Sequence, residues 1–342
     1  MTIYAADIVF GLAWGDEGKG KITSHLAKSY NYNFVCRWAG GPNAGHTVYI
    51  DGNKYKTHLI PSGVFHGVTS VIGPGCVLNP SKFWQELSYL KDAGFDTSLI
   101  KVSPNTHIIT QKHISLDKKN LSESLGTTSN GIAYSYADRA ARVGIRAKDV
   151  LPKEMIWDQQ LYGEILCEGA QGVWLDLDWG NYPFVTSSVT LPYGACSLGI
   201  PMEKVRDIWG VAKIYDTRSG EDPKFPDTLL LDQDLHELAE LGNEYGVTTG
   251  RARKVNWLDL NYLVNAIKIS GANKIVINKC DIISQLGVYK LYWNDNLLNF
   301  NSLDEMKTFI IEIISRNSIC QDNIYFSGHP EIIEDDANVT NA

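Results

Sequence analysis

The sequence predicts an α/β fold in which a mostly parallel central sheet is flanked by helices around a P-loop-like nucleotide-binding core. Short apolar runs bounded by glycine alternate with segments of helical periodicity, as expected of parallel strands joined by crossover helices. The first apolar run leads into a glycine-rich turn, and several later runs end at loops that carry glycine or aspartate. Because the carboxyl ends of parallel strands meet at one edge of a sheet, these loops predict a ligand site there.

The predicted elements follow this pattern in order. Ala6–Phe10 is expected to be the first strand, Lys19–Ser29 the helix after the glycine turn, and Thr69–Ile72 another strand. A helix is expected over Ser81–Ala93, beginning at Ser81. Three later strands each precede a candidate loop: Ile165–Cys167 before "EGAQG", Val205–Tyr215 before "DTRSGEDPKFPD", and Lys274–Ile277 before "NKCD".

No convincing linker interrupts the chain, so residues 1–342 are predicted to form one elaborated domain. The polar segment Gln111–Ser124 is expected to be a mobile connection. The acidic residues 331–342 are expected to be a frayed tail.

Composition excludes several classes of protein. Of the 342 residues 44% are apolar and 20% charged, and the formal net charge of −8 argues against nucleic-acid binding over a broad surface. No run approaches the ~18 apolar residues that a membrane span needs, and the first residues lack the basic start of a signal peptide. Six separated cysteines without a C-x-x-C pair favour reduced thiols in the cytoplasm over disulfides or a zinc site.

The turn "GLAWGDEGKGKI" (Gly11–Ile22) has the parts of a phosphate-binding loop: glycines, Lys19 and the start of a helix. It is not a Walker A loop, because Gly20 stands where serine or threonine is required. Asp16 and Glu17 would repel phosphate oxygens, so these two carboxylates must be neutralised or used chemically.

Three further stretches suit a nucleotide site, although each alone is also typical of a solvated turn. "GGPNAGHTV" (Gly40–Val48) places His46 where it can act as a general acid or stabilise charge. "INKCD" (Ile277–Asp281) supplies a lysine and an aspartate after a strand, a usual way to bind guanine. "YGVTTGRARKVNW" (Tyr245–Trp257) is a basic loop suited to carboxylates and phosphate.

Together these stretches resemble the adenylosuccinate synthetase family. The matches "WGDEGKGKI", "GGPNAGHTV", "HLIPSG", "GTTSNGIAYSYADRAARVGIR", "EGAQGVWLDLDWGNYPFVTSS" and "YGVTTGRARKVNWLD" occur in the family's order. The chain resembles a short form without the helical segment that bacterial members carry between Asp149 and Glu168. The family couples L-aspartate to purine C6 with GTP and Mg²⁺. The resemblance implies that Asp16 takes the proton of purine N1, that O6 attacks the γ-phosphate, and that the aspartate amine displaces phosphate from the 6-phosphoryl intermediate.

The resemblance also assigns binding roles. Lys19 and His46 would stabilise the transferred phosphoryl group, and Mg²⁺ would lie against Asp16 and the carbonyl of Gly45. The purine monophosphate would be held by Asn43, Thr128, Gln171, Thr186, Ser219 and Arg251, and by the partner subunit's Arg142, which implies a homodimer. Aspartate would be held by Thr248, Thr249 and Arg251. The donor nucleotide would be held by Gly15, Glu17, Gly18, Lys19, Gly20, Gly45, His46, Thr47, Arg253, Lys279, Asp281, Ser327 and Gly328.

The chain departs from the family at several positions, and the change at Ser219 bears on the purine substrate. Asn130 stands where the phosphate loop usually has Arg or Lys, and Ser219 stands where a valine lies near the base. Ser219, with Glu221 and Asp222 nearby, offers acceptors to an amine at purine C2, which guanine has and hypoxanthine lacks.

The sequence therefore favours dGMP, the substrate of phage relatives that make N6-succino-2-amino-2'-deoxyadenylate for 2-aminoadenine DNA; such a chain would act in the host cytoplasm. IMP and AMP biosynthesis are the alternative, supported by Asp16, which many phage relatives lack.

The donor and the class of protein have alternatives of their own. Lys279 and Asp281 favour GTP, but the family's "STGP" element becomes "FSGHP" (Phe326–Pro330), which leaves ATP or dATP open. A regulatory GTPase is disfavoured by Gly20 and by "DIWG" (Asp207–Gly210), which lies within an apolar strand. A non-catalytic nucleotide-binding protein is disfavoured because the acid, the lysine and the histidine are all present.

Overall fold

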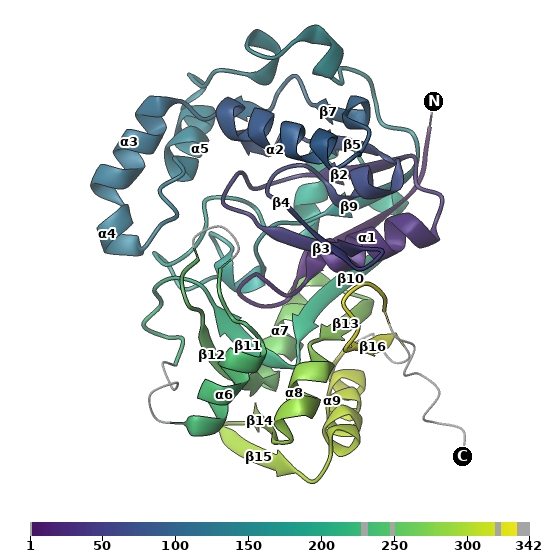
Figure 1. Ribbon diagram of the computed structural model, residues 1–342, viewed down its shortest axis with the longest axis vertical. Helices are drawn as coiled ribbons and strands as arrows, with labels where there is room; N and C mark the ends of the chain where they lie inside the picture. The colour runs from purple at the N-terminus through teal and green to yellow at the C-terminus, as the bar shows by residue number, and fades with distance from the viewer. Residues whose placement is uncertain (1, 227–231, 247–249, 319–322, 334–342) are drawn as a thin grey trace.

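The computed structural model shows an eight-stranded sheet in which every neighbouring pair runs parallel (Figure 1). The structure describes residues 2–226, 232–246, 250–318 and 323–333. Across the sheet the strands are β16 (Ile324–Ser327), β13 (Lys274–Asn278), β10 (Val205–Lys213), β1 (Ile3–Gly11), β9 (Gly163–Glu168), β2 (Phe34–Arg37), β5 (Thr69–Ile72) and β7 (Ile100–Val102). The predicted α/β class with a parallel central sheet is confirmed.

A smaller, four-stranded sheet lies beside the large one. Its order is β11 (Tyr215–Arg218), β12 (Lys254–Asp259), β14 (Tyr289–Trp293) and β15 (Asn296–Phe300), with only β12 and β14 parallel. Two further pairs are the antiparallel hairpin of β3 (His46–Ile50) with β4 (Asn53–Thr57), and the parallel pair of β6 (Val77–Leu78) with β8 (His107–Ile108).

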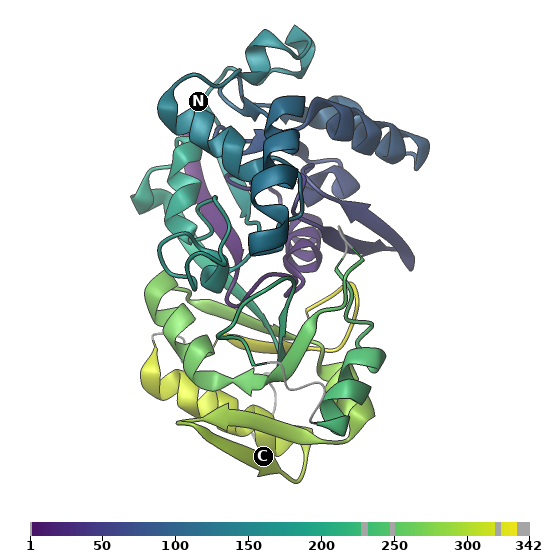
Figure 2. The same cartoon turned by 90° about the vertical axis from the view of Figure 1, so that its left-hand side faces the viewer.

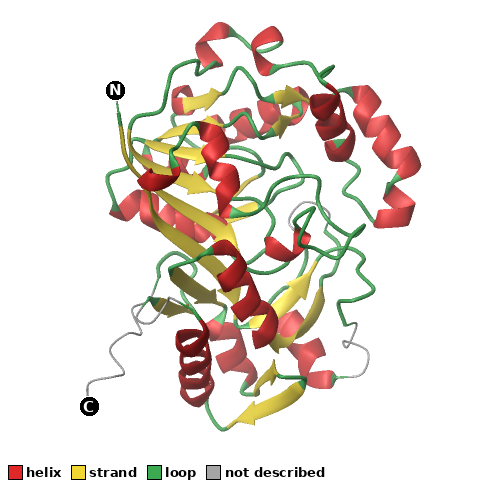
Figure 3. Cartoon of the chain, turned by 180° about the vertical axis from the view of Figure 1, so that it is seen from behind, coloured by secondary structure: helices red, strands yellow, loops and turns green. Residues whose placement is uncertain are grey.

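The helices surround both sheets (Figure 3), and the two halves of the chain occupy opposite ends of the molecule (Figures 1 and 2). The first half carries α1 (Lys19–Ser29), α2 (Pro80–Asp92), α3 (Gln111–Asn120), α4 (Ser122–Leu125) and α5 (Ile132–Ala141). The second half carries α6 (Gln233–Leu241), α7 (Leu260–Ser270), α8 (Cys280–Leu286) and α9 (Leu303–Asn317). None of the helices in the described ranges combines the length and the apolarity that crossing a membrane requires.

Packing explains why the central strands read as apolar runs. Ile8 and Phe10 of β1, Cys167 of β9 and Ile277 of β13 belong to one buried cluster. Val9 faces the other side of the sheet and belongs to a second cluster under α1. Strands buried on both faces lack the alternation of polar and apolar residues that marks a half-exposed strand. The edge formed by the carboxyl ends of β1, β9, β10 and β13 is therefore where polar loops gather.

Three predicted elements differ from the structure. Helix α2 does not begin at Ser81, because the side chain of Asn79 caps it by accepting the Lys82 N–H at 3.1 Å, and Pro80 fits the first turn. The predicted mobile connection Gln111–Ser124 is instead α3 and the start of α4. Thr110 caps α3, and the side chain of His113 completes a capping box.

The predicted strand Val205–Tyr215 is two strands. β10 ends at Lys213, and the chain then passes to β11 in the smaller sheet. Ile214 donates its N–H to the carbonyl of Asn278 at 2.9 Å, which closes the large sheet at this corner. "DIWG" lies within β10, as expected. Of the predicted tail, residues 334–342 lie outside the described residues.

Candidate active site

A cavity of about 890 Å³ lies at the carboxyl ends of the central strands. Its walls come from loops that are far apart in the sequence, including those after β1, β11 and β13. The sequence-predicted residues that line it are Gly15, Asp16, Glu17, Gly18, Lys19, Gly20, Asn43, Gly45, His46, Thr47, Thr128, Gln171, Thr186, Ser219, Arg253, Lys279, Asp281, Ser327 and Gly328.

Four predicted site residues stand apart from that set. Arg142 is exposed and ends α5 in a left-handed conformation, outside the lining of this cavity. Arg251 is exposed too, and its Nη1 donates to the carbonyl of Gly126 at 3.0 Å. Thr248 and Thr249 lie outside the described residues.

Glu17 is neutralised inside the opening loop. Its buried carboxylate contacts the Lys19 ammonium at 2.5 Å and accepts the N–H groups of Gly15 at 2.8 Å and Ala13 at 3.2 Å. Asn278 of β13 donates to the Glu17 carbonyl at 2.8 Å. Gly18 has φ of 98°, and a Cβ there would lie 2.9 Å from the Asn278 amide nitrogen. Glu17 therefore shapes the loop, and its charge is balanced by Lys19.

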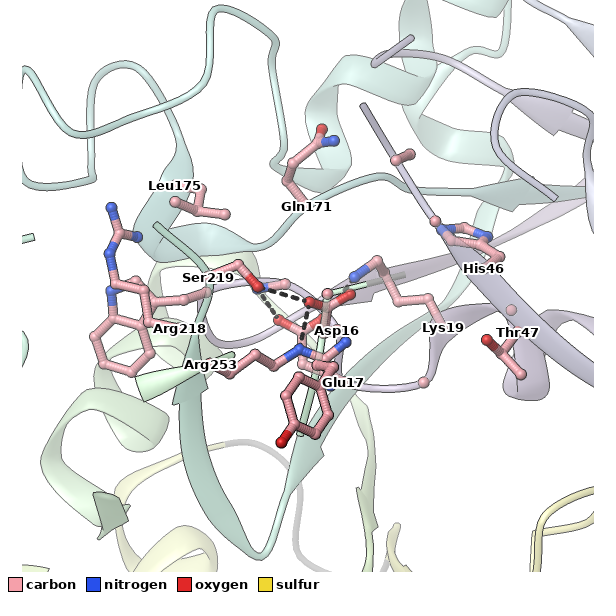
Figure 4. Close-up of a pocket in the computed structure, with 18 of the residues that line it drawn as sticks. Asp16, Glu17, Lys19, His46, Thr47, Gln171, Leu175, Arg218, Ser219 and Arg253 are labelled. Carbon is pink, nitrogen blue, oxygen red and sulfur yellow. Dashed lines mark hydrogen bonds and ion pairs between the residues drawn. The ribbon is translucent and has the colours of Figure 1, made fainter. Parts of the chain in front are cut away.

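Asp16 is presented to the cavity, with 24% of its side chain exposed. Its carboxylate accepts from Arg253 Nε at 2.9 Å and from Ser219 Oγ at 3.3 Å, the contacts drawn as dashed lines in Figure 4. Arg253 and Ser219 lie more than two hundred residues further along the chain. Asp16 is thus the acid of the loop that remains available for chemistry.

The side chain of His46 contacts a carboxylate that was not among the residues predicted from the sequence. Its Nδ1 contacts Glu168, which is fully buried at the end of β9. Glu168 also accepts from Ser62, at 2.7 Å from the N–H and 2.8 Å from the hydroxyl. Glu168 could have been noticed as an acid at the end of a predicted apolar strand.

The charges of this pair follow from their surroundings. Burial lowers the pKa of His46, although Glu168 opposes the shift. Burial alone would raise the pKa of Glu168, but His46, Arg37 and the Ser62 N–H outweigh it and hold that pKa below its usual range. When the imidazole is neutral and donates from Nδ1 to Glu168, Nε2 is the ring atom that can exchange a proton with a ligand.

The same histidine explains the departure from a Walker A loop. A Cβ at Gly20 would lie 2.8 Å from Cβ of His46, closer than real Cβ atoms approach. Serine or threonine at this position would push α1 away from β3. The histidine thus occupies the place next to the loop where a Walker A hydroxyl would stand.

A buried ionic network behind Arg253 also escaped the sequence analysis. Glu244 contacts Arg253 at 2.5 Å and Lys213 at 2.9 Å, and it accepts from the Tyr215 hydroxyl at 2.6 Å. Burial alone would raise the pKa of Glu244, but Lys213 and Arg253 outweigh it and lower that pKa to about 2. An ionised Glu244 fixes the guanidinium that holds Asp16. A lysine ending an apolar strand, as Lys213 does, was the available signal.

The stretches "NKCD" and "FSGHP", which are predicted to bind the base of the donor nucleotide, lie side by side because Asn278 of β13 pairs with Ser327 of β16. Lys21 bridges them, donating to the Asn278 side chain at 2.9 Å and to Ser327 Oγ at 2.6 Å. Lys279 has φ of 71° and donates to the Gly242 carbonyl at 3.2 Å. Residues of both "NKCD" and "FSGHP" line the cavity at this corner.

The surroundings of Ser219 weaken the sequence argument for a 2-amino group. Asp222 is buried and already contacts Arg218 Nε at 3.2 Å, Asn181 Nδ2 at 2.6 Å and the Lys224 N–H at 2.9 Å. It is not among the residues that line the cavity. Ser219 itself donates to Asp16. Of the three expected acceptors, Asp222 is committed to the protein itself.

The phosphate-loop position at which the chain departs from the family, Asn130, is in contact with a lysine from another element. Lys82 of α2 donates to Asn130 Oδ1 at 2.5 Å, and Asn130 Nδ2 donates to Thr128 Oγ1 at 3.0 Å. Thr128 lines the cavity, whereas Lys82 and Asn130 do not.

The fold and this site define an α/β nucleotide-binding enzyme in which an acid, a lysine and a histidine converge where a phosphoryl group can be transferred. Comparison with known proteins narrows the class. The sequence model of adenylosuccinate synthetase matches residues 8–163 and 153–294. The chain belongs to the adenylosuccinate synthetase family, and it is an NTP-dependent ligase that forms a C–N bond.

Individual relatives agree. Adenylosuccinate synthetase of Shouchella clausii is 38% identical over an alignment covering 83% of this chain and 79% of the relative, and that of Lactococcus lactis is equally similar. The fully ligated adenylosuccinate synthetase of Plasmodium falciparum has a TM-score of 0.79 at 26% identity, covering 96% of this chain and 98% of that one. The succinoaminodeoxyadenylate synthetase of cyanophage S-2L, bound to dGMP and dATP, has a TM-score of 0.74 at 18% identity, covering 96% and 94%, and shares the fold.

Proposed function

We propose that this protein joins L-aspartate to C6 of IMP with GTP as phosphoryl donor, forming adenylosuccinate. The observation that carries the reaction is the convergence of Asp16, Lys19 and the Glu168-backed His46 on one cavity. IMP is preferred to dGMP because the 38% identical relatives are adenylosuccinate synthetases, and because Asp222 is not free to accept a 2-amino group. The preference for dGMP drawn from Ser219 is therefore set aside.

In the proposed reaction Asp16 turns from Arg253 toward the purine and takes the proton of N1. O6 then attacks the γ-phosphorus of GTP, GDP leaves, and the aspartate amine displaces phosphate from C6. Lys19 and the protonated Nε2 of His46 stabilise charge on the transferred group, with Glu168 stabilising the imidazolium.

The remaining predicted residues take binding roles. Asn43, Thr128, Gln171, Thr186 and Ser219 line the cavity where IMP would be held, while Arg251, Thr248 and Thr249 would hold the aspartate. The donor would lie along the opening loop, with its base at Lys279, Asp281, Ser327 and Gly328. ATP and dATP are alternatives for the donor, and the "FSGHP" corner is the place where that choice would be made.

Asp16 and Gly45 both line the cavity, and the Asp16 carboxylate and the Gly45 carbonyl would supply two oxygen donors to Mg²⁺. No group of three His, Cys, Asp or Glu side chains among the described residues could hold a metal. Mg²⁺ usually keeps water and phosphate oxygens as most of its ligands, so a single carboxylate is enough. When bound, it would neutralise charge on the donor phosphates.

The test is turnover with defined substrates. Purified protein with Mg²⁺, L-aspartate and GTP is supplied with IMP or dGMP, and phosphate release and product mass are followed, with ATP and dATP as donors in parallel. We expect faster turnover with IMP and GTP. Faster turnover with dGMP would make dGMP the substrate, and no turnover with either purine would refute the reaction.

We also propose a homodimer in which Arg142, exposed at the end of α5, reaches the partner's nucleotide. Mixing two inactive variants, Arg142→Leu and Asp16→Asn, tests this arrangement. A mixed dimer contains one site with both functional residues, so random exchange should restore about a quarter of the parent activity. No recovery, despite subunit exchange seen by mass spectrometry, would refute a shared site.

We propose, finally, that the chain is one domain acting in the cytoplasm. The described cysteines (Cys36, Cys76, Cys167, Cys196 and Cys280) are free thiols, which suits a reducing compartment. A single calorimetric unfolding transition and recovery of the native protein in the cytoplasmic fraction are expected. Two separated transitions would indicate two domains, and recovery elsewhere would refute the location.

A further inference from the structure

Lys82 is an exposed lysine at an unusual position in its helix. It is the third residue of α2, close to the positive end of the helix dipole, where a cation is disfavoured. Desolvation and the neighbouring Lys118 both lower its pKa. None of the ion pairs among the described residues includes Lys82. Its hydrogen bond to Asn130, at 2.5 Å, points to a role in holding that side chain.

Asn130 connects Lys82 to Thr128, a residue that lines the cavity. It is only 6% exposed, so its amide has few alternatives to the partners around it. Because an ammonium group can only donate, the amide oxygen must face Lys82 and the amide N–H₂ must face Thr128. A hydroxyl that accepts from an amide directs its own proton elsewhere, and Thr128 lies in the cavity wall.

We propose that Lys82 is a positioning residue for the phosphate of the purine monophosphate: through Asn130 it holds the Thr128 hydroxyl with its proton directed into the cavity. Without Lys82 the amide can rotate and present its oxygen to Thr128. The Thr128 hydroxyl would then donate its proton to Asn130. Its lone pairs would face the ligand, where they repel phosphate oxygens.

The rest of the loop is already held by other bonds. Asp117 accepts from the Thr127 hydroxyl and the Gly131 N–H, both at 2.7 Å, so each of its carboxylate oxygens has a partner within the loop. Thr128 is the loop hydroxyl that Lys82 controls through Asn130. This inference rests on the proposed function, because it assumes that a purine monophosphate occupies the cavity.

The experiment measures equilibrium binding of IMP, dGMP and inosine to the full chain without donor, so it does not depend on turnover. Lys82→Met should weaken both monophosphates by about tenfold, the loss of one charge-assisted contact, and leave inosine unchanged. Lys82→Arg should restore the affinity. Lys91→Met, an exposed lysine in the last turn of the same helix, is the matched control. In turnover, KM for the monophosphate should rise while kcat stays constant.

Two further variants separate positioning from fold. Asn130→Asp can accept from Lys82 but cannot donate to Thr128, so it should also weaken monophosphate binding. In a Thr128→Val background, Lys82→Met should cost no further affinity. Unchanged binding in Lys82→Met, an equal loss for inosine, or a full tenfold loss in the Thr128→Val background would each overturn the proposal. If the variants change monophosphate binding as expected but the parent protein does not turn over IMP, the proposed function is refuted and the positioning role of Lys82 stands.

Discussion

The substitution Glu168→Gln would remove the negative charge next to His46 and keep the size and shape of the side chain at position 168. The carboxylate is fully buried and accepts two bonds from Ser62, which an amide oxygen can still accept in part. The amide N–H₂ would then face His46 Nδ1 and favour the tautomer with its proton on Nε2. The variant therefore changes which nitrogen of the His46 ring carries the proton, and it removes the anion that would stabilise the imidazolium in the proposed reaction.

The expected loss can be estimated from the electrostatic attraction within a buried ion pair. Two unit charges ~4 Å apart at an effective dielectric constant of about 20 attract by about 4 kcal/mol. If that attraction acts only when His46 is protonated in the transition state, kcat should fall by roughly 10³. KM for IMP should change little, because Glu168 does not line the cavity.

The assay is steady-state phosphate release as a function of pH, together with thermal unfolding. Glu86→Gln is the matched control, because Glu86 is also buried and accepts the N–H groups of His58, Leu59 and Ile60, away from the cavity lining. Both variants should lose some stability, but only Glu168→Gln should lose kcat. A loss below fivefold, or an equal loss in both variants, would refute the role given to Glu168.

Three other predictions concern Asp16, His46 and a third ionisable residue, Asp216, which is buried in β11. Asp16→Asn should lower kcat by about 10²–10⁴ while IMP still binds, which calorimetry can check; wild-type turnover would exclude Asp16 as the base. GTP binding at pH 7.5 should be accompanied by the uptake of about one proton, because burial lowers the pKa of His46 in the free protein and the donor phosphates raise it in the complex. Calorimetry in buffers of different ionisation enthalpy measures this uptake. The variant His46→Gln should take up no proton. Burial raises the pKa of Asp216 to about 8 in the folded protein. Between pH 4 and pH 8 the folded protein therefore keeps a proton on Asp216 that the unfolded chain has released. The free energy of unfolding falls as the pH rises through this range. Asp216→Asn, which still accepts the Asp259 N–H, should therefore be more stable by about 2–5 kcal/mol at pH 8 and similar at pH 4; an equal difference at both pH values would contradict this.

Local patterns carried much of the fold and most of the cavity lining. Lys19–Ser29 and Thr69–Ile72 have their predicted bounds, because apolar runs and a glycine turn are local signals. The cavity could be anticipated because the carboxyl ends of parallel strands meet at one edge, wherever the strands lie in the sequence. The helix α3 was missed because its apolar side is weak, and its stability comes from the Thr110 cap and the buried His113 and Asp117.

What the sequence by itself determined is therefore the α/β class, the family, and the loops that supply Asp16, Lys19 and His46. Only the tertiary structure decided which partner each polar group takes: Glu168 under His46, Glu244 behind Arg253, and Lys82 on Asn130. The structure likewise shows that Asp222 contacts Arg218 and does not line the cavity. A charged group in a buried site takes whichever partner the packing brings within about 3 Å, and the spacing of residues along the chain does not encode that distance.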